Sequence, residues 1–462
     1  MNCANGTKYE LLSHECVRIN RYWRLSAYKC VLGNKEDMKM FVRAIDSQNV
    51  CVIEKLQMAF SEGMNVIIGN NGAGKTSLLK AIAAIINQPM QMVRDSNSPI
   101  NITGDVRVTT AVIGETVTQP IPHYPVNITG SVIFNNREYK CDREVSNEAS
   151  EYGSRHRELM EFFRTNFGDS SIEFPLLSYL NAGRGKIIQK KQAYISLNGE
   201  EVRRIDGYNK AFSSELNIDD IQNWCFKMDF TEFQDKKPVK EYLEFQSIVS
   251  KFFSFIDEST TAIKVYYSGK KEAIVFNDGN EEKPLYQLSA GYQAVLCMII
   301  ELAYRAVILN PILENVSENI TGTVLIDEIE MHLHPAWQWK ILEALRGTFP
   351  KVQFIIATHS PIILSSASDT SIFLMNSPNE VISVGDAYGY SINDVLSLLQ
   401  ASEYQPARIS DYYRRAEEIF DQGTDGELNE LLQKAETELK DNPGVLKNFM
   451  DFIEVNRWAE EA

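Results

Sequence analysis

The chain has 462 residues, of which 44% are hydrophobic and 23% are charged, and its formal net charge is −16. This composition is typical of a globular protein with a sizeable core, and the length fits about three domains or one large core with an insertion. The acidic balance argues against nonspecific coating of nucleic acid, although a local basic groove is still compatible with it.

Cysteine usage and hydropathy predict a cytoplasmic location and no membrane association. The seven cysteines are scattered and form no Cys-x-x-Cys pair, which indicates reduced thiols. The N-terminus lacks the basic start and apolar core of a signal peptide. The longest apolar stretch, residues 294–309, is interrupted by Glu301 and Arg305, so we expect a buried helix there and not a membrane span.

The first part of the chain leads into a glycine-rich loop. Residues 1–36 are polar and weakly periodic, and we expect an N-terminal extension there. Apolar stretches between residues 38 and 60 predict short strands, and the apolar run at residues 64–68 predicts another. That run precedes the octapeptide GNNGAGKT, and residues 77–86 follow it with helical spacing. Strand, glycine loop and helix in this order are the context that a phosphate-binding loop requires.

The octapeptide supplies a predicted nucleotide-binding site. Its glycines allow backbone N–H groups to turn inward around phosphate oxygens, and the start of the helix adds partial positive charge. Lys75 would neutralise the β- and γ-phosphates of ATP, and Thr76 would hold Mg²⁺ through its hydroxyl. The predicted nucleotide-binding residues here are Gly69, Asn70, Asn71, Gly72, Ala73, Gly74, Lys75, Thr76 and Ser77.

The middle of the chain predicts further sheet and an insertion. Residues 98–141 alternate polar and apolar side chains and predict two or three hairpin strands. Residues 145–168 have a helical pattern, and residues 174–180 predict a core strand followed by a loop with Arg184. Residues 184–204 form a weak basic patch, which a solvated hairpin explains better than a DNA contact.

An aromatic-rich stretch follows this patch. Residues 208–257 predict two helices that break near Lys237 and Pro238. Aromatic side chains recur at helical spacing in this stretch, among them Trp224 and Phe233. Core packing of a helical insertion explains them better than a platform for stacked bases.

Three motifs in the second half complete a candidate ATPase site. In LSAGYQ, Ser289 is placed to cap a long apolar helix, and its hydroxyl with the amide of Gly291 would form an anion site. The strand at residues 323–326 ends in Asp327, which would reach Mg²⁺, and Glu328, which would polarise the attacking water. Helix capping is the alternative for this acidic pair.

A histidine closes the set of motifs. His359 follows the strand at residues 354–358 and could donate to a γ-phosphate oxygen. The stretch EMHLHP at residues 330–335 contains His332 and His334, but no third ligand at metal spacing stands near them. We interpret it as a loop that contacts an opposite subunit.

The order GNNGAGKT, LSAGYQ, VLIDE, EMHLHP and IIATHSP over residues 38–370 resembles the RecF/SMC/OLD branch of ATP-binding-cassette ATPases. The resemblance implies an α/β head with a mixed core sheet that carries the P-loop, a side β-sheet, a helical insertion and a C-terminal helical appendage. The expected parts are an extension (1–36), a first head lobe (37–144), a core strand with the insertion (145–285), a second head lobe (286–388) and an acidic helical region (389–462).

The resemblance also implies a homodimer of heads that encloses two ATP molecules. Lys75, Thr76, Asp327, Glu328 and His359 would belong to one half-site, with Lys75, Glu328 and His359 catalytic and with Thr76 and Asp327 holding Mg²⁺. Ser289 and Gly291 would complete the facing half-site. In such folds a glutamine beyond the helix that follows the P-loop contacts Mg²⁺ and the γ-phosphate. The sequence leaves open which of three glutamines fills this role: Gln88, Gln91 or Gln119.

Departures from the family narrow the expected function. The interval between Lys75 and Ser289 is too short for SMC arms, and no Toprim nuclease pattern follows His359. Compact heads of this kind resemble ATPase subunits of bacterial antiphage systems, Septu above all. This resemblance implies an ATPase that either hydrolyses ATP or turns it over slowly as a sensor. It also implies a separate nuclease subunit of the HNH type. Higher homo-oligomers and DNA contact through the complex are further expectations.

The tail and two competing functions complete the hypothesis. Residues 401–462 carry 15 acidic and 7 basic side chains, which suits either the docking of a basic protein or a solvated helical cap. A RecF-like repair ATPase that binds DNA in an ATP-dependent way is the alternative function. A transporter ATPase is disfavoured because no membrane segment is predicted.

Overall fold

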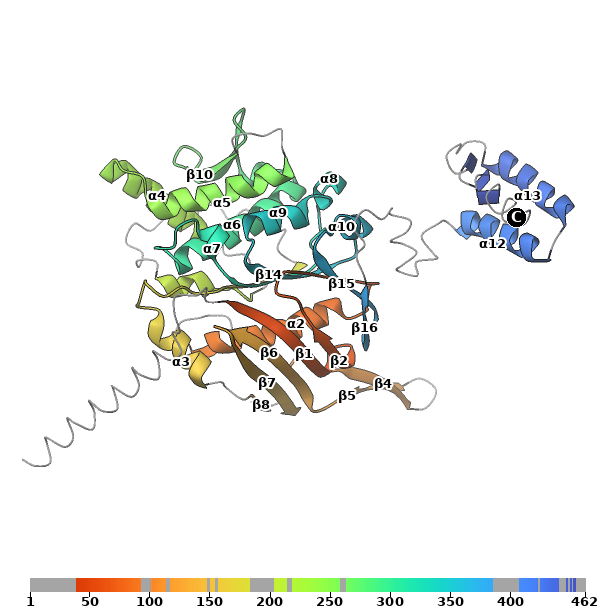
Figure 1. Cartoon of the computed structure of the whole chain (residues 1–462), viewed down its shortest axis with the longest axis horizontal. Coiled ribbons are helices and arrows are strands. Elements are labelled where there is room, and N and C mark those ends of the chain that lie inside the picture. The colour runs from red at the N-terminus through yellow and green to blue at the C-terminus, as the bar shows by residue number, and fades with distance from the viewer. Residues whose placement is uncertain are drawn as a thin grey trace, which may run out of the picture. The chain divides into compact units, whose positions relative to one another are not determined.

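A computed structural model describes most of the chain as two compact units, Met1–Gly389 and Tyr390–Ala462, each of which is described by itself (Figure 1). The expected N-terminal extension, Arg184 and most of the basic patch after it lie outside the described residues. The described residues are 39–92, 100, 102–113, 117–147, 150–153, 157–182, 203–213, 218–257, 263–384, 407–422, 424–439, 446–447, 449–450 and 452–453.

The first unit is built around a six-stranded core sheet with the strand order β16-β15-β3-β14-β13-β9. All neighbouring strands are parallel except the antiparallel edge pair β15 and β16. Every residue of β3, β9, β13 and β14 is buried, as expected for a parallel sheet covered on both faces. The strands are β3 (Met64–Ile68), β9 (Leu176–Leu180), β13 (Gly322–Ile326), β14 (Val352–Thr358), β15 (Thr370–Ser377) and β16 (Glu380–Val384).

The register of the core sheet brings four strand ends to one edge. Ile326 pairs with Leu180 and with Ile356, and Thr358 pairs with Ile68. The loops that follow β3, β9, β13 and β14 therefore leave the sheet side by side. Ligands bind at this carboxyl edge in open α/β sheets.

Helix α2 (Lys75–Ile86) lies between the core sheet and a second sheet (Figure 1). All of its residues except Thr76 and Lys80 are buried. The helix is apolar on two opposite sides after its first turn because it contacts β13 and β14 on one side and β1, β6 and β7 on the other.

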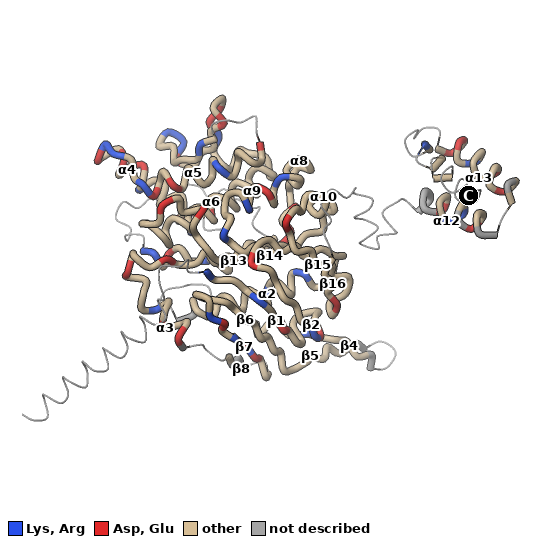
Figure 2. The backbone as a smooth tube through the Cα atoms, in the orientation of Figure 1, with Lys and Arg blue, Asp and Glu red and all other residues tan. Residues whose placement is uncertain are grey.

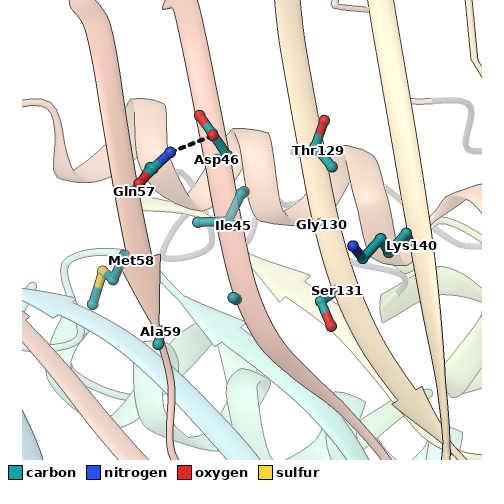
Figure 3. A pocket seen from close by; sticks show the side chains of 10 residues that line it. Ile45, Asp46, Gln57, Met58, Ala59, Thr129, Gly130, Ser131 and Lys140 are labelled. Carbon is teal, nitrogen blue, oxygen red and sulfur yellow. Dashed lines mark hydrogen bonds between the residues drawn. The ribbon is translucent and has the colours of Figure 1, made fainter.

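The second sheet is the expected side sheet and has the antiparallel order β2-β1-β6-β7-β8. Gly130 lets this sheet approach α2, since a Cβ there would lie 2.6 Å from Cγ2 of Ile85. A shallow hollow over these strands is lined by both apolar side chains, such as Ile45 and Met58, and polar ones, and Gln57 donates to Asp46 in it at 2.6 Å (Figure 3). The strands are β1 (Met40–Val50), β2 (Ile53–Ala59), β6 (Val126–Phe134), β7 (Arg137–Asn147) and β8 (Ser150–Tyr152).

The sheet region is richer in strands than the sequence predicted. A separate ribbon of β4 (Val108–Ile113) and β5 (Val117–Pro122) precedes β6 and β7, so four strands occupy the region where two or three were expected. The predicted helix over residues 145–168 is partly wrong, because the end of β7 and all of β8 occupy its first part. Only α3 (Arg157–Asn166) is helical there.

The second half of the head is built around α6 (Ala290–Leu309). This is the one described helix that is long and apolar enough to cross a membrane, but it is a core helix, since every residue from Ala294 to Leu309 is buried. Its two charged residues pair inside the protein. Arg305 Nη2 lies 2.5 Å from Glu301 Oε1, and Arg305 Nη1 donates to the carbonyl oxygens of Gly207 and Asn209 at 2.8 and 2.9 Å.

The insertion contains the two expected helices, α4 (Ile218–Asp235) and α5 (Lys240–Ile256), which break at the predicted place. Trp224 packs edge-to-face against Phe245 and Tyr304, which confirms a core role for that aromatic. Three strands cover this layer: β10 (Lys264–Ser268), β11 (Ala273–Asn277) and β12 (Glu282–Pro284). Shorter helices complete the head: η1 (Gln88–Met92), η3 (Arg204–Tyr208), η4 (Leu285–Gln287), α7 (Val316–Asn319), α8 (Pro335–Gln338), α9 (Ile341–Thr348) and α10 (Pro361–Ser365).

The second unit is helical. It contains α12 (Ala407–Gln422) and α13 (Asp425–Glu438), and a capping box of Thr424 and Glu427 starts the latter. The described residues of this unit have an apolar core of their own. That core consists of Tyr412, Ala416, Leu428, Leu431, Ala435, Leu439, Phe449 and Ile453.

Candidate functional site

The glycine loop between β3 and α2 has the backbone that an anion cradle requires. Gly72 and Gly74 have φ of 79° and 99°, in the left-handed region that favours glycine. A Cβ on Gly69 would lie 1.9 Å from the carbonyl oxygen of Met375, so only glycine fits against β15. The loop leads directly into α2, and the dipole at the start of that helix favours a negative ligand.

Lys75 is the buried cation of the loop, with 5% of its surface exposed. Its Nζ donates to the carbonyl oxygens of Gly69 and Asn70 at 2.9 and 3.0 Å, and it lies 3.3 Å from Nδ1 of His359. Burial lowers the pKa of Lys75 to about 8, although the carboxylates of Asp327, Glu330 and Glu328 act in the opposite direction. A phosphate group beside this ammonium would favour its charged form.

Asp327 lies directly beside the first turn of α2. It follows β13, its backbone N–H donates to the carbonyl oxygen of Leu180 at 2.9 Å, and only 3% of its surface is exposed. The hydroxyl of Thr76 donates to Oδ2 of Asp327 at 2.8 Å. A carboxylate and a hydroxyl oxygen at this separation are the donor set that Mg²⁺ prefers next to a nucleotide phosphate, so these two residues fit the ion.

Glu328 turns into the same site because the chain changes direction at this residue. Its φ is 46°, in the left-handed region, so it does not continue the alternation of β13. Its carboxylate acts on the pKa of both Lys75 and His359, which places its charge near the two cationic groups. Asp327 therefore lies beside Thr76, whereas Glu328 lies near Lys75 and His359. These different neighbours suit separate roles in metal binding and in water activation.

His359 stands at the end of β14 and is half-buried. Burial and the neighbouring Lys75 lower its pKa, while Glu330 and Glu328 partly oppose that shift. The ring is therefore neutral at pH 7, so one of its nitrogens carries a proton that it can donate to a phosphate oxygen.

Glu330 holds the loop that carries this histidine, and the sequence did not single it out. Its Oε1 accepts a hydrogen bond from the backbone N–H of His359 at 2.5 Å, and its Oε2 accepts one from the hydroxyl of Thr358 at 2.7 Å. Thr358 in turn accepts from the N–H of Ser360 at 3.0 Å. The only sequence signal was its place at the start of EMHLHP, which was interpreted as a subunit contact.

The rest of that loop packs against the signature motif. His334 caps α8, since its Nδ1 accepts from the N–H of Ala336 at 3.2 Å. The carbonyl oxygen of His332 would lie 2.6 Å from a Cβ on Gly291, which explains a glycine there. Among the residues that the structure describes, no group of three or more His, Cys, Asp or Glu is arranged to hold a metal ion.

Ser289 occupies the N-cap position of α6, but its hydroxyl makes no capping hydrogen bond. The predicted N-cap position of Ser289 is therefore confirmed, and its side chain does not serve as the cap. Ser289 and Ala290 are both exposed. The hydroxyl is thus available to a ligand that approaches the start of α6 from outside the chain.

The three candidate glutamines have different environments. Gln88 is buried, and its Nε2 donates to the carbonyl oxygen of Asp142 at 2.8 Å, which ties η1 to the side sheet. Gln119 is exposed on β5, and the side chain of Gln91 lies outside the described residues. Asn181 follows β9 and is thereby placed beside Asp327 at the edge of the core sheet, although no glutamine motif marks this position in the sequence.

The P-loop, the acidic pair at the end of β13 and the histidine at the end of β14 together define the head of an ATP-binding-cassette-type ATPase. This arrangement agrees with the order of the motifs in the sequence. A family model described as an AAA domain matches residues 45–273.

The chain is similar to several named proteins. Over 419 residues the chain is 26% identical to the Retron Vc95 probable ATPase of Vibrio cholerae serotype O1 biovar El Tor, with 79% of this chain and 80% of that protein covered. Over 343 residues it is 22% identical to the Septu protein PtuA of Bacillus thuringiensis, with 71% and 74% covered. A solved SMC head bound to the C-winged helix domain of ScpA superposes with a TM-score of 0.46 and 15% identity over 75% of this chain and 98% of that chain.

Proposed function

We propose that the chain binds and hydrolyses MgATP at the edge of its core sheet and that its nucleotide state controls a separate nuclease. The ATPase proposal rests mainly on the hydrogen bond of 2.8 Å between Thr76 and Asp327, which joins the helix after the P-loop to the acidic residues that follow β13. Lys75 and His359 lie in contact at the same edge. An anion cradle, a hard-metal donor pair and a second carboxylate are the parts that phosphoryl transfer to water needs.

Each group has a role that follows from its position. Lys75 and the loop amides bind the β- and γ-phosphates and neutralise their charge. Thr76 and Asp327 would hold Mg²⁺, which supplies charge neutralisation at the phosphates when it is bound. Glu328 orients the attacking water and polarises it, and His359 donates a hydrogen bond to a γ-phosphate oxygen.

A second head would complete the site. The exposed hydroxyl of Ser289 and the amides at the start of α6 suit a γ-phosphate held by another copy. Two copies would then enclose two ATP molecules, each contributing Ser289 and Gly291 to the site of its partner. The two heads would then close only when ATP is bound, and this closure would signal the nucleotide state to the nuclease.

The wider role is proposed from the relatives. Proteins named retron ATPases and Septu PtuA match more than two thirds of this chain. A cytoplasmic antiphage defence complex with an HNH-type nuclease subunit is the function that this similarity supports. DNA would be contacted through the complex, and the acidic helical unit after residue 390 offers a docking surface for a basic partner.

A pair of variants tests the ATPase assignment. Glu328→Gln should keep ATP bound and slow its hydrolysis by a factor of about 100 or more, as loss of a general base does. Lys75→Met should weaken ATP binding itself. Binding is measured by equilibrium titration with a fluorescent ATP analogue, and turnover by phosphate release. Wild-type turnover by Glu328→Gln would show that another group activates the water.

The alternative function, a RecF-like repair ATPase, predicts a different outcome for the isolated protein. Such a protein would bind duplex DNA only with ATP, and the affinity would fall steeply with salt. The defence proposal predicts little DNA binding by the chain alone and recovery of a nuclease subunit when the tagged protein is purified from its native host. DNA affinity without a nuclease partner would favour the alternative.

A further inference from the structure

Helix α2 carries two basic residues, and only the first belongs to the phosphate site described above. Lys75 is buried at the start of the helix, whereas the side chain of Lys80 is 42% exposed (Figure 2). Thr76 and Lys80 are the two residues of α2 that are not buried, and their spacing of four places them on one face of the helix. This face also meets Asp327, because the hydroxyl of Thr76 donates to that carboxylate.

Asp105 holds the ammonium group of Lys80. Lys80 Nζ donates to Oδ1 of Asp105 at 2.9 Å, and the side chain of Asp105 is only 16% exposed. The same carboxylate oxygen accepts a hydrogen bond from Sγ of Cys51 at 3.4 Å. Burial raises the pKa of Cys51 to about 11, so the thiol keeps its proton at neutral pH and acts as a donor. Asp105 therefore binds one cation and one neutral donor.

Backbone hydrogen bonds fix the position of Asp105. Its carbonyl oxygen accepts from the N–H of Cys51 at 2.6 Å, and its N–H donates to the carbonyl oxygen of Ile102 at 3.0 Å. Two residues further on, the N–H of Arg107 donates to the carbonyl oxygen of Asn49 at 2.9 Å. The carboxylate is thus fastened to the end of β1 and to the turn after it, whereas Lys80 reaches it through a flexible chain of methylene groups.

A second carboxylate attracts the same ammonium group. The hydrogen bond with Asp105 is the largest cause of the raised pKa of Lys80, and the charge of Asp327 also raises it. Lys80 therefore lies within electrostatic reach of the residue that would hold Mg²⁺. Side chains four residues apart on a helix are separated by about 5 to 6 Å at Cβ, so a released Lys80 would be able to pass Thr76 and approach Asp327. A cation at that place would repel Mg²⁺.

We propose that Asp105 is a positioning residue for the metal site, which holds Lys80 away from Asp327 and so keeps that carboxylate available to Mg²⁺. This inference rests on the proposed MgATP site and adds to it two residues from outside the P-loop and the acidic end of β13. The competing explanation is that Lys80 binds a phosphate of the nucleotide directly. That role predicts weaker nucleotide binding without Lys80 even when no metal is present.

The test compares the affinity of a fluorescent ATP analogue in excess Mg²⁺ with its affinity in EDTA, by equilibrium titration of the full-length protein. The ratio of the two affinities measures how strongly Mg²⁺ and nucleotide favour each other's binding. Asp105→Asn should lower this ratio at least threefold, because the neutral amide holds Lys80 less firmly. Lys80→Met should not lower the ratio. The double variant should have the ratio of Lys80→Met, since no cation remains to be released.

The matched control is Glu54→Gln. It breaks the ion pair of Glu54 with Arg107, which has the same length of 2.9 Å and joins β2 to the segment that carries Asp105. This variant should keep the wild-type ratio. Circular dichroism checks that each variant is folded, and Lys80→Met tests the proposal even if Asp105→Asn is unstable.

Three results would overturn the positioning role. A purely structural ion pair would change both affinities equally, so a folded Asp105→Asn variant with the wild-type ratio would contradict the proposal. A double variant with the low ratio of Asp105→Asn would also contradict it, as would weaker binding of the analogue to Lys80→Met in EDTA. A wild-type protein that binds the analogue no better with Mg²⁺ would instead refute the MgATP site itself, so the two failures are distinguishable.

Discussion

Replacing Glu330 by alanine should destabilise the head and slow ATP hydrolysis together. The carboxylate accepts hydrogen bonds from the N–H of His359 and the hydroxyl of Thr358 at 2.5 and 2.7 Å. A hydrogen bond to a charged group contributes about 1.5 to 3 kcal/mol. Glu330 is only half-buried, so water would replace part of the loss, and we expect a cost of about 3 kcal/mol for Glu330→Ala.

The matched control is Glu330→Gln, whose amide oxygen can still accept from the N–H of His359. We expect it to cost about 1 kcal/mol, since it loses charge but keeps one acceptor. Thermal unfolding followed by fluorescence should then show a midpoint about 6 °C lower for alanine and about 2 °C lower for glutamine. Phosphate release should fall more in the alanine variant, because His359 is no longer fixed. Wild-type unfolding and turnover in Glu330→Ala would refute the positioning role.

Three further predictions concern the glycine loop and the signature. Gly69→Ala should destabilise the head by about 3 kcal/mol or more, because its Cβ would overlap Met375, whereas Gly63→Ala, with no atom within 4 Å, should change thermal stability by less than about 0.5 kcal/mol. Ser289→Arg in a Glu328→Gln background should abolish the ATP-dependent rise in mass while a fluorescent ATP analogue still binds. The pKa of Lys75 is lowered to about 8, so ATP binding in EDTA should take up about one proton at pH 9 and clearly fewer at pH 7.5, as calorimetry in two buffers can measure.

The same pKa shift has a consequence for the stability of the protein without nucleotide. Between pH 8 and about 10.4, the ordinary pKa of lysine, the unfolded chain binds more protons at Lys75 than the folded chain does. The contribution of Lys75 to stability therefore rises with pH across that interval.

The sequence predicted the residues of the site better than the contacts that position them. GNNGAGKT and the run before Asp327 are local patterns, because the strand, the loop and the helix are contiguous, and a reader can recognise their chemistry without the fold. The role of Glu330 depends on β14, which pairs beside β13 only after folding. Asn181 likewise comes to the site through the register of β9 with β13, which no local pattern records.

Two wrong or incomplete expectations have physical reasons. Arg143 of β7 points inward and donates to the carbonyl oxygens of Ala84 and Ile100. A charged residue at a buried position breaks the alternation of apolar and polar side chains that indicates a strand. The end of β7 was therefore included in the helix predicted over residues 145–168. In the insertion, Trp224 and Phe233 both occur at helical spacing. Spacing alone cannot distinguish the face of α4 that meets the head from the face that meets solvent, so both were assigned to the core.

The buried pair in α6 determines how its signature serine can move. Arg305 is fully buried and is bound to Glu301 within the helix and to the carbonyl oxygens of Gly207 and Asn209 outside it, while Ser289 at the other end is bound by no cap. The helix is thus held by polar bonds near its C-terminal end, whereas its start is held by the packing of Tyr292 on Phe276 and Trp337. We expect that α6 shifts as a rigid body when Ser289 binds a triphosphate held by a neighbouring copy. Such a shift would displace the backbone around Gly207. ATP bound to one subunit would thereby change the interior of the subunit that contributes Ser289.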